Sequence, residues 1–357
     1  EIGSGLVGSE MCIRDRIQPY GIAADNNFYM TNHQDLIFVP EVELRDNQRM
    51  AEENPVRVEV ERAVAKVVVS GVPEVVPHGD RIDNLKWGLD VTNMYTYWMR
   101  KMTFIANSGG VPNEMEQLNA GYREERYAED PNFTRFSSWN GGNPVGQFEY
   151  LSGTPELSKN FDDYDYTLEN TMDAADQRHD VTTRVVISGT YTPNGFGSVA
   201  TRNGGGISFY YFKGNAIRVE AMRDMVNDRG QIPQELRDAG LEQAIENVLA
   251  WNPNAFNSPT ASFSEGGIHF YYQGVCYYTV LIRHFSNNMV PVLMGYGRYG
   301  VVRNNVYQLS INKIIGPGQP VINPPGTDPD DEDTSWISAD VNIMRWYIRN
   351  QNVEELL

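Results

Sequence analysis

The sequence predicts an all-β protein built from two β-sandwich domains. Its 357 residues exceed the length of one typical domain, so two domains are the natural expectation. Aromatic residues make up 11% of the chain, which also holds 20 tyrosines and 32 glycines. Together with runs of β-branched residues, this composition favours sheet over helix. Short apolar segments separated by turn residues are typical of a sandwich.

The strongest strand signal of the first half spans residues 56–69, where valine recurs at closely spaced positions. Further strands are predicted around residues 28–32, and over 82–98, where Trp87 lies within an apolar alternation. The stretch 106–160 is rich in Gly, Asn, Pro and Ser, and we expect it to form surface loops.

In the second half, strands are predicted over residues 182–192, 207–212 and 301–315. Residues 267–285 have the pattern of a β-hairpin that turns at Gln273-Gly274. Between these strands, the apolar positions of residues 216–250 recur at helical spacing, which predicts a helical insertion in the second domain. The residues of this helical stripe are Leu236, Leu241, Ala244, Ile245, Val248 and Leu249.

The chain ends in a strand-like tail that follows an acidic, proline-rich linker. Prolines, glycines and the acidic run 328–333 predict a linker that is extended and mobile rather than packed. The tail alternates apolar and polar residues and changes parity at Met344, which indicates a bulge or contact with two surfaces. A lone strand needs a partner sheet, on its own body or on another molecule. The candidate assembly residues are Ile337, Ala339, Val341, Ile343, Trp346 and Ile348.

These patterns divide the chain into five predicted segments. Residues 1–16 show no helix or strand period and resemble translated sequencing-adapter sequence, so we expect them to be non-native and the export signal to be missing. Residues 17–163 form an N-terminal domain truncated at its start, with an unpaired edge at 56–69 or a neighbouring strand. Residues 164–315 form the C-terminal domain, 316–335 the linker, and 336–357 the candidate donor strand.

The chemistry of the chain excludes several functions. A net charge of −18 opposes binding to nucleic acid. The two cysteines, Cys12 and Cys276, provide neither a disulfide framework nor a paired-cysteine metal site. His269 and His284 could face each other across the predicted hairpin and bind a metal ion. They are also consistent with ordinary polar side chains at the margin of a partly buried sheet. No catalytic motif occurs, and the acidic run lacks the spacing of a calcium loop. We therefore predict no catalytic, cofactor-binding or metal-binding residues, and no enzyme.

Several short motifs, in order along the chain, resemble the fimbrillins of the Bacteroidales, the subunits of type V pili, and among them the minor-fimbriae subunits. Each motif alone is weak, but their ordered set is fairly specific. The matching stretches are Phe28 to Asn32, Val60 to Val67, Leu85 to Trp87, Leu168 to Asn170, Tyr299 to Leu309 and Ser338 to Trp346.

The resemblance implies two transthyretin-like β-sandwich domains and a structural role in cell-surface fimbriae that support adhesion. It further implies export across the outer membrane as a lipoprotein precursor, and polymerisation by donor-strand exchange. The partners would be other fimbrial subunits, including accessory proteins, and a host or bacterial surface receptor. The lipobox cysteine and removable strand that the family places before Phe28 are absent here.

One alternative remains open at this point, a surface carbohydrate-binding β-sandwich lipoprotein. It would stack sugars on Trp98, Trp139 and Tyr122. Such a site needs an exposed aromatic platform with convergent polar groups. Burial of these rings would argue against it.

Overall fold

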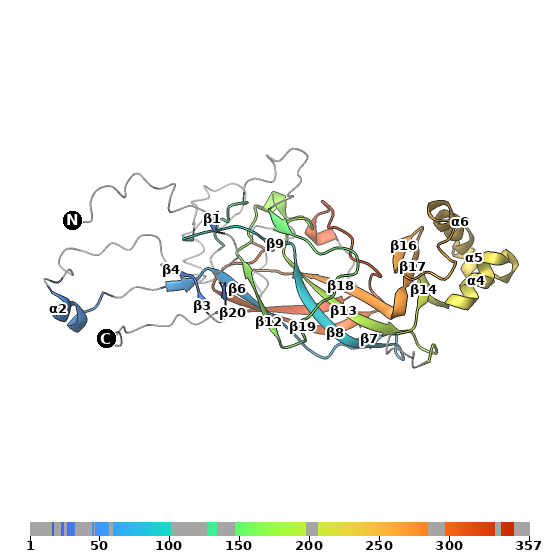
Figure 1. The fold of residues 1–357 in the computed structure, drawn as a ribbon, viewed down its shortest axis with the longest axis horizontal. Helices are drawn as coiled ribbons and strands as arrows, with labels where there is room; N and C mark the ends of the chain where they lie inside the picture. The colour runs from blue at the N-terminus through green and yellow to red at the C-terminus, as the bar shows by residue number, and fades with distance from the viewer. Residues whose placement is uncertain are drawn as a thin grey trace.

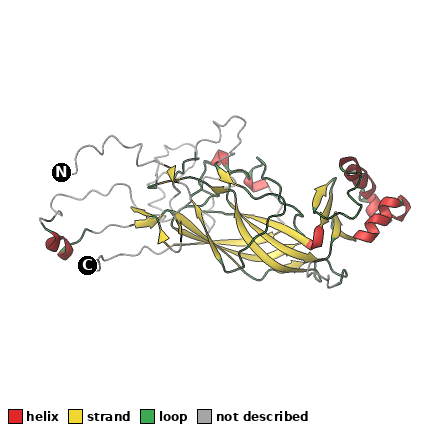
Figure 2. Ribbon diagram, in the orientation of Figure 1, coloured by secondary structure: helices red, strands yellow, loops and turns green. Residues whose placement is uncertain are grey.

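The chain folds mainly into β-sheet with few helices, as expected (Figure 2). The computed structural model describes residues 16–17, 23–24, 27–32, 45, 47–56, 60–100, 127–133, 147–197, 206–284, 297–332 and 337–345. Two sheets pack face to face in the body of the molecule, and a smaller sheet with helices lies at one end (Figure 1).

The first sheet of the sandwich is centred on β6 (Val64–Ser70) and β19 (Asn305–Ile315), which run parallel. Strand β12 (Tyr164–Leu168) pairs antiparallel with the other side of β6. Strand β20 (Ile337–Arg345) pairs antiparallel with β19, and the short β7 (Glu74–Val76) continues the parallel pairing along β19. The order β12-β6-β19-β20 places the C-terminal strand last in this sheet.

The second sheet has three antiparallel strands. Strand β13 (Arg184–Thr192) lies between β8 (Arg81–Asp90) and β18 (Val275–Leu281). β13 is rich in β-branched residues, and its Val185, Val186 and Ile187 are fully buried. Such residues fit this central strand because both of its edges are paired and both of its faces are covered, with Val186 packed on Tyr277 and Ile322 on the side away from the main core.

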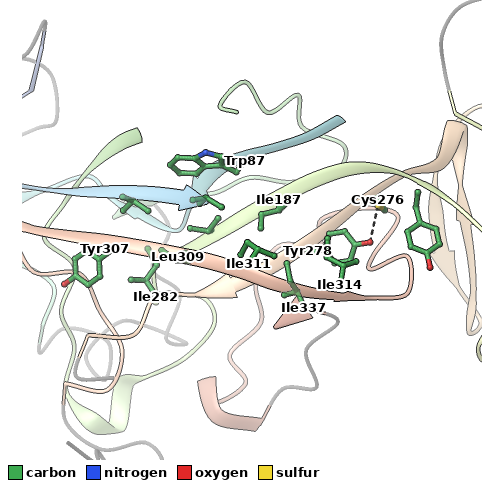
Figure 3. Packing of buried hydrophobic residues seen from close by; sticks show 14 of the residues in the cluster. Trp87, Ile187, Cys276, Tyr278, Ile282, Tyr307, Leu309, Ile311, Ile314 and Ile337 are labelled. Carbon is green, nitrogen blue, oxygen red and sulfur yellow. Dashed lines mark hydrogen bonds between the residues drawn. The ribbon is translucent and has the colours of Figure 1, made fainter. Parts of the chain in front are cut away.

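Alternate residues of the two sheets meet in one core (Figure 3). Val67 of β6 and Trp87 of β8 are fully buried there, as are Ile187 of β13 and Leu309 of β19. The indole Nε1 of Trp87 donates to the carbonyl oxygen of Asn160 at 2.7 Å, so its one polar group is satisfied inside the core. Burial of these large side chains is the main source of stability of the sandwich.

Strands from both predicted domains share these sheets. β6 and β8 come from residues 17–163, whereas β13, β18 and β19 come from residues 164–315. Among the described residues, the predicted boundary at 163/164 therefore does not separate two cores. The division into two transthyretin-like domains stays a prediction. Local patterns could not indicate this arrangement, because β6 pairs with β19, which lies far along the chain.

The unpaired edge expected at residues 56–69 is not found at β6. This strand is flanked by β12 on one side and β19 on the other. Its neighbour β12 is the first strand in the order of this sheet. The parallel β6–β19 pair supplies the missing partner, which a local alternation of valines could not reveal.

A smaller sheet carries the helices. Its order is β15 (Asn215–Arg218), β14 (Phe209–Phe212), β17 (Ile268–Tyr271) and β16 (Phe263–Glu265). Helices α4 (Val219–Asn227), α5 (Gln234–Asp238) and α6 (Leu241–Trp251) pack on it around a second core. The apolar residues expected to form a helical stripe lie in α5 and α6 and face that core. Whether the segment is an insertion in a separate domain stays a prediction.

The hairpin predicted over residues 267–285 is wrong. β17 joins the helical sheet while β18 joins the sandwich, so the two strands do not pair with each other. The chain turns between them at η7 (Tyr272–Gly274), where Gln273 has a φ of 54° and Gly274 a φ of 69°. A Cβ on Gly274 would lie 2.5 Å from the carbonyl oxygen of Tyr191, so only glycine allows this close passage.

One described part of the stretch expected to form surface loops is different from the prediction. Residues 127–133 are buried throughout, whereas residues 147–160 are mostly exposed or half-buried, as a surface loop requires. The hydroxyl of Tyr127 donates to the carbonyl oxygen of Tyr299 at 2.7 Å, and Asn132 is fully buried. A polar loop can be buried in this way because its polar groups find partners inside the protein.

The remaining elements are short. Arg16, the last residue of the segment expected to be non-native, pairs with Tyr97, and residues 1–15 lie outside the described residues. These elements are β1 (Arg16–Ile17), β2 (Ala23–Ala24), β3 (Asn27–Phe28), β4 (Met30–Asn32), α2 (Gln48–Glu53), β5 (Val60–Arg62), β9 (Thr92–Asn93), β10 (Thr96–Tyr97), β11 (Phe148–Glu149), η5 (Ala174–Asp176), η6 (Arg229–Gln231) and η8 (Asp330–Glu332).

Candidate assembly site

The candidate assembly strand β20 pairs with β19 of its own chain. The register places Leu309 opposite Val341 and Ser310 opposite Asp340. The pairing shifts once, between Ile311 and Lys313, so the irregularity lies in β19. The tail thus completes a sheet of its own body in this structure, the first of the two partners that its pattern allows.

The alternation predicted for the tail is visible in its first residues. Ile337 is 6% exposed and belongs to the sandwich core, and Ala339 and Val341 pack partly buried against the same core. Ser338 and Asp340 between them are exposed. Ile343 is paired through its backbone with Tyr307. Trp346 and Ile348 lie outside the described residues.

The described part of the linker, residues 316–332, is anchored to the body at several points, which corrects the prediction that it is mobile rather than packed. Two tyrosine hydroxyls donate to its first carbonyl oxygens, from Tyr278 to Gly316 at 2.9 Å and from Tyr271 to Gly318 at 2.6 Å. The backbone of Ile322 exchanges two hydrogen bonds with Gly153, at 2.7 and 2.8 Å. A chain rich in proline and glycine can be held in this way because its exposed carbonyl groups accept hydrogen bonds from side chains.

Replacing Gly318 with Ala is expected to destabilise the protein by more than about 1 kcal/mol. Gly318 has a φ of 59°, and a Cβ there would lie 2.4 Å from the carbonyl oxygen of Tyr277. Gly197→Ala is the matched control, because Gly197 has a φ of 69° with open space around it. Urea denaturation of both variants measures the difference. Equal losses of stability would mean that the linker is not held close to Tyr277.

Two carboxylates of the acidic run, Asp330 and Asp331, are turned toward the body of the protein, whereas Asp328 is exposed. Asp330 is 3% exposed, and its Oδ2 accepts a hydrogen bond from the hydroxyl of Thr182 at 2.5 Å. Asp331 Oδ1 accepts from Arg298 Nε at 2.8 Å and from the hydroxyl of Tyr299 at 2.7 Å. Burial raises the pKa of the Asp330 carboxyl to about 7, although the hydrogen bond from Thr182 opposes this shift.

A buried ion pair positions the other end of β19. Arg303 and Glu169 are both fully buried, with Arg303 Nε 3.1 Å from Glu169 Oε2. Arg303 also donates to Thr96 Oγ1 at 2.9 Å, and its own carbonyl oxygen accepts from Arg100. Arg100 in turn pairs with the buried Glu61 at 2.7 Å. These contacts fix the turn that leads into β19 relative to three other segments.

Asp130 joins this polar cluster from the buried loop 127–133. Its carboxylate accepts from the backbone N–H groups of Asn132 and Thr171 and from Asn93 Nδ2, at 2.6, 2.9 and 3.0 Å. Burial raises its pKa to about 8 against the effect of these donors. Every described contact of the group is internal, so we assign it to the architecture of the sandwich.

The described residues offer little for catalysis. Among them, no three His, Cys, Asp or Glu side chains are placed to hold a metal ion. His269 Nδ1 lies 2.8 Å from the hydroxyl of Ser264, and His284 Nδ1 lies 2.7 Å from that of Tyr307, so the two histidines do not face each other. Burial raises the pKa of the Cys276 thiol to about 12, which is the opposite of an activated nucleophile.

Of the three aromatic residues predicted to stack sugars, the structure describes Trp98. Trp98 is 37% exposed, and its ring packs edge-to-face on Tyr29 with the ring centroids 4.7 Å apart. Trp139 and Tyr122 lie outside the described residues. Within the described ranges, no helix has both the length and the apolar character that a membrane crossing needs.

Residues 269–352 match the family of the major fimbrial subunit protein type IV, fimbrillin, C-terminal region. The match includes β17, β18, β19 and β20. No curated protein matches the chain.

Among solved structures, a fimbrilin (fimA) of Porphyromonas gingivalis is 14% identical over 82% of this chain and 61% of its own, with a TM-score of 0.37. A putative cell adhesion protein of Parabacteroides distasonis is 13% identical over 82% of this chain and 54% of its own, with a TM-score of 0.29. One of Bacteroides eggerthii is 12% identical over 81% of this chain and 57% of its own, with a TM-score of 0.26. The chain therefore spans less than two thirds of each of these proteins.

Proposed function

We propose that this chain, whose residues 269–352 belong to the fimbrillin family, is a structural subunit of cell-surface fimbriae that support adhesion. Fimbrillins are structural proteins, and no enzymatic activity is assigned to the chain. The observation that carries the proposal is the C-terminal strand, which lies inside the family match and is the last strand of its sheet. Its partners are other subunits of the same fimbria, accessory subunits, and a surface receptor.

The subunits polymerise by donor-strand exchange in this proposal. β20 leaves β19 of its own chain and pairs with a sheet of the next subunit. Strand addition takes its affinity from backbone hydrogen bonds and its specificity from alternate side chains in pockets. The anchors are the residues Ile337, Ala339, Val341, Ile343, Trp346 and Ile348.

The exchange is energetically reasonable because the same kind of contact is lost and gained. In the monomer, β20 pairs with β19 from Ile337 to Arg345 and buries Ile337. We call β20 and the residues after it the C-terminal arm. A subunit that releases its own arm and binds the arm of a neighbour keeps a comparable number of backbone hydrogen bonds and a comparable apolar contact. Export as a lipoprotein precursor and removal of an N-terminal strand belong to the same proposal.

Deletion of residues 336–357 tests it. The truncated chain lacks an arm to donate but can still accept one, so we expect it to form no filaments alone and to shorten wild-type filaments when mixed in. The fold should persist at lower stability, because the sandwich core loses Ile337 and the contacts of Ala339 and Val341 but keeps its other members. Electron microscopy measures filament length, and circular dichroism measures the fold.

Mixing the truncated chain with wild-type subunits distinguishes a defect in assembly from a defect in folding. An unfolded chain would leave wild-type filaments at their normal length. Normal filaments formed by the truncated chain alone would refute the donor role of the tail.

A further inference from the structure

The acidic segment before β20 is held on the body by three kinds of contact. The backbone N–H of Asp330 donates to the carbonyl oxygen of Gln177 at 3.2 Å, and the N–H of His179 donates to that of Asp328 at 3.1 Å. The Asp330 carboxyl enters a buried position against Thr182, and Asp331 pairs with Arg298. We call these contacts of residues 328–331 the acidic clasp.

The acidic clasp contacts segments that lead into both sheets of the sandwich. Arg298 and Tyr299 precede the turn that leads into β19, and residues 177–182 precede β13. The clasp therefore joins the start of the arm to the two sheets of the sandwich. Asp331 and Arg298 are both largely buried, with side-chain exposures of 7% and 16%, so their ion pair is poorly screened by solvent.

We propose that the acidic clasp is a latch that limits the reach of the C-terminal arm and thereby favours pairing of β20 with its own β19. Only residues 332–336 separate the clasp from β20, and an extended chain of that length spans at most about 20 Å. Once the clasp opens, the next anchor is Ile322, and the arm can reach about 50 Å. The consequence for assembly rests on the proposed function, but the latch itself does not.

The length of the tether also determines the probability that a released β20 pairs again with its own β19. A longer tether lowers the probability of re-pairing by loop entropy. Opening of the clasp should therefore raise the unpaired population of β20 about four-fold. The closed clasp keeps the arm on its own body, and the open clasp allows it to meet a neighbour.

The experiment is amide hydrogen exchange of the monomer carrying Thr182→Val and Asp331→Asn. These changes remove one donor to Asp330 and the charge that pairs with Arg298. The hydrogen-bonded amide of residues 328–331, the N–H of Asp330, should therefore exchange about ten-fold faster or more. Amides of β20 should also exchange faster, by up to about four-fold when the variants hold the clasp fully open. Asp328→Asn is the matched control, because the side chain of Asp328 is exposed in the same acidic run and both exchange rates should stay at wild-type values.

Two results would overturn the latch. Unchanged exchange at residues 328–331 would mean that these contacts do not hold the segment, and faster exchange there with unchanged β20 would mean that the segment does not restrain the arm. Arg298→Gln provides a second variant that breaks the same ion pair from the body. Filament formation is measured separately, so failure of the fimbrial proposal would leave the exchange result intact.

The pH dependence gives an independent readout. Asp330 faces Asp180 and Arg184 of the body, Asp331 of its own segment, and the hydroxyl of Thr182. Its pKa is about 7 in the closed clasp and returns toward 3.8 when the clasp opens, so opening releases a proton. The closed clasp is most stable in acid. As the pH rises from about 4 to about 7, the ratio of closed to open clasp falls by up to about ten-fold per pH unit.

Exchange at residues 328–331, corrected for the intrinsic pH effect, should therefore speed up as the pH rises from about 5 to about 7. Asp330→Asn should remove this slope. A slope that survives in Asp330→Asn would assign the titration to another group.

Discussion

Replacing Arg303 with Met lowers the free energy of unfolding by about 3–5 kcal/mol. The substitution leaves the Glu169 carboxylate buried without its cation, and both side chains of the pair are fully buried. It also removes the donors to Thr96 Oγ1 and to the carbonyl oxygen of Tyr97, which connect β10 to the turn before β19. Urea denaturation measures the loss.

A surface pair provides the control for this prediction. Arg49 and Glu53 lie 3.4 Å apart with side-chain exposures of 81% and 56%, and Arg49→Met should cost no more than about 1 kcal/mol. Replacing Arg303 and Glu169 together with apolar residues should cost less than the sum of the two single changes. A loss at Arg303 as small as that at Arg49 would contradict the structural role of the buried pair.

Much of the sandwich follows from local alternation in the sequence. Tyr307, Leu309 and Ile311 mark the inner face of β19, and Val185 and Ile187 mark that of β13. The helical spacing of Leu241, Ile245 and Val248 likewise corresponds to the buried face of α6. In each case a period of two or of 3.6 residues identifies the buried face directly.

The partner of each strand could not be predicted in this way. Alternation indicates which face of β6 is buried, but the parallel neighbour β19 lies far along the chain. The same limit explains the incorrect hairpin, because a turn at Gln273-Gly274 joins strands of one sheet as readily as strands of two. Pairing depends on the non-local packing of the whole core.

At the candidate site, composition was misleading about the linker. Prolines, glycines and acidic residues indicated an extended chain, but the tyrosine hydroxyls and Arg298 that hold it come from distant segments. The alternation of Ile337, Ala339 and Val341 against Ser338 and Asp340 is visible in β20. Their role in assembly remains our proposal.

Locking β20 to its own β19 should abolish filament formation. Ser310 and Asp340 are directly opposite each other in the antiparallel pair, at the short Cα separation that a disulfide requires. In a background with Cys12→Ser, the pair Ser310→Cys and Asp340→Cys should close a disulfide within one chain. The arm then cannot leave, whereas the buried Cys276 takes no part.

A second cysteine pair controls for oxidation. Lys66 and Tyr166 are opposite each other in the β6–β12 pair, which does not include the arm. Lys66→Cys with Tyr166→Cys should assemble equally well with and without reductant.

Filaments counted by electron microscopy, in the presence and absence of reductant, show whether β20 must leave its own sheet for assembly. Oxidised Ser310→Cys/Asp340→Cys subunits should remain monomeric, and reduction should restore filaments to the wild-type number. Filaments formed equally well by the oxidised, intramolecularly linked subunits would contradict the claim that β20 leaves its own sheet.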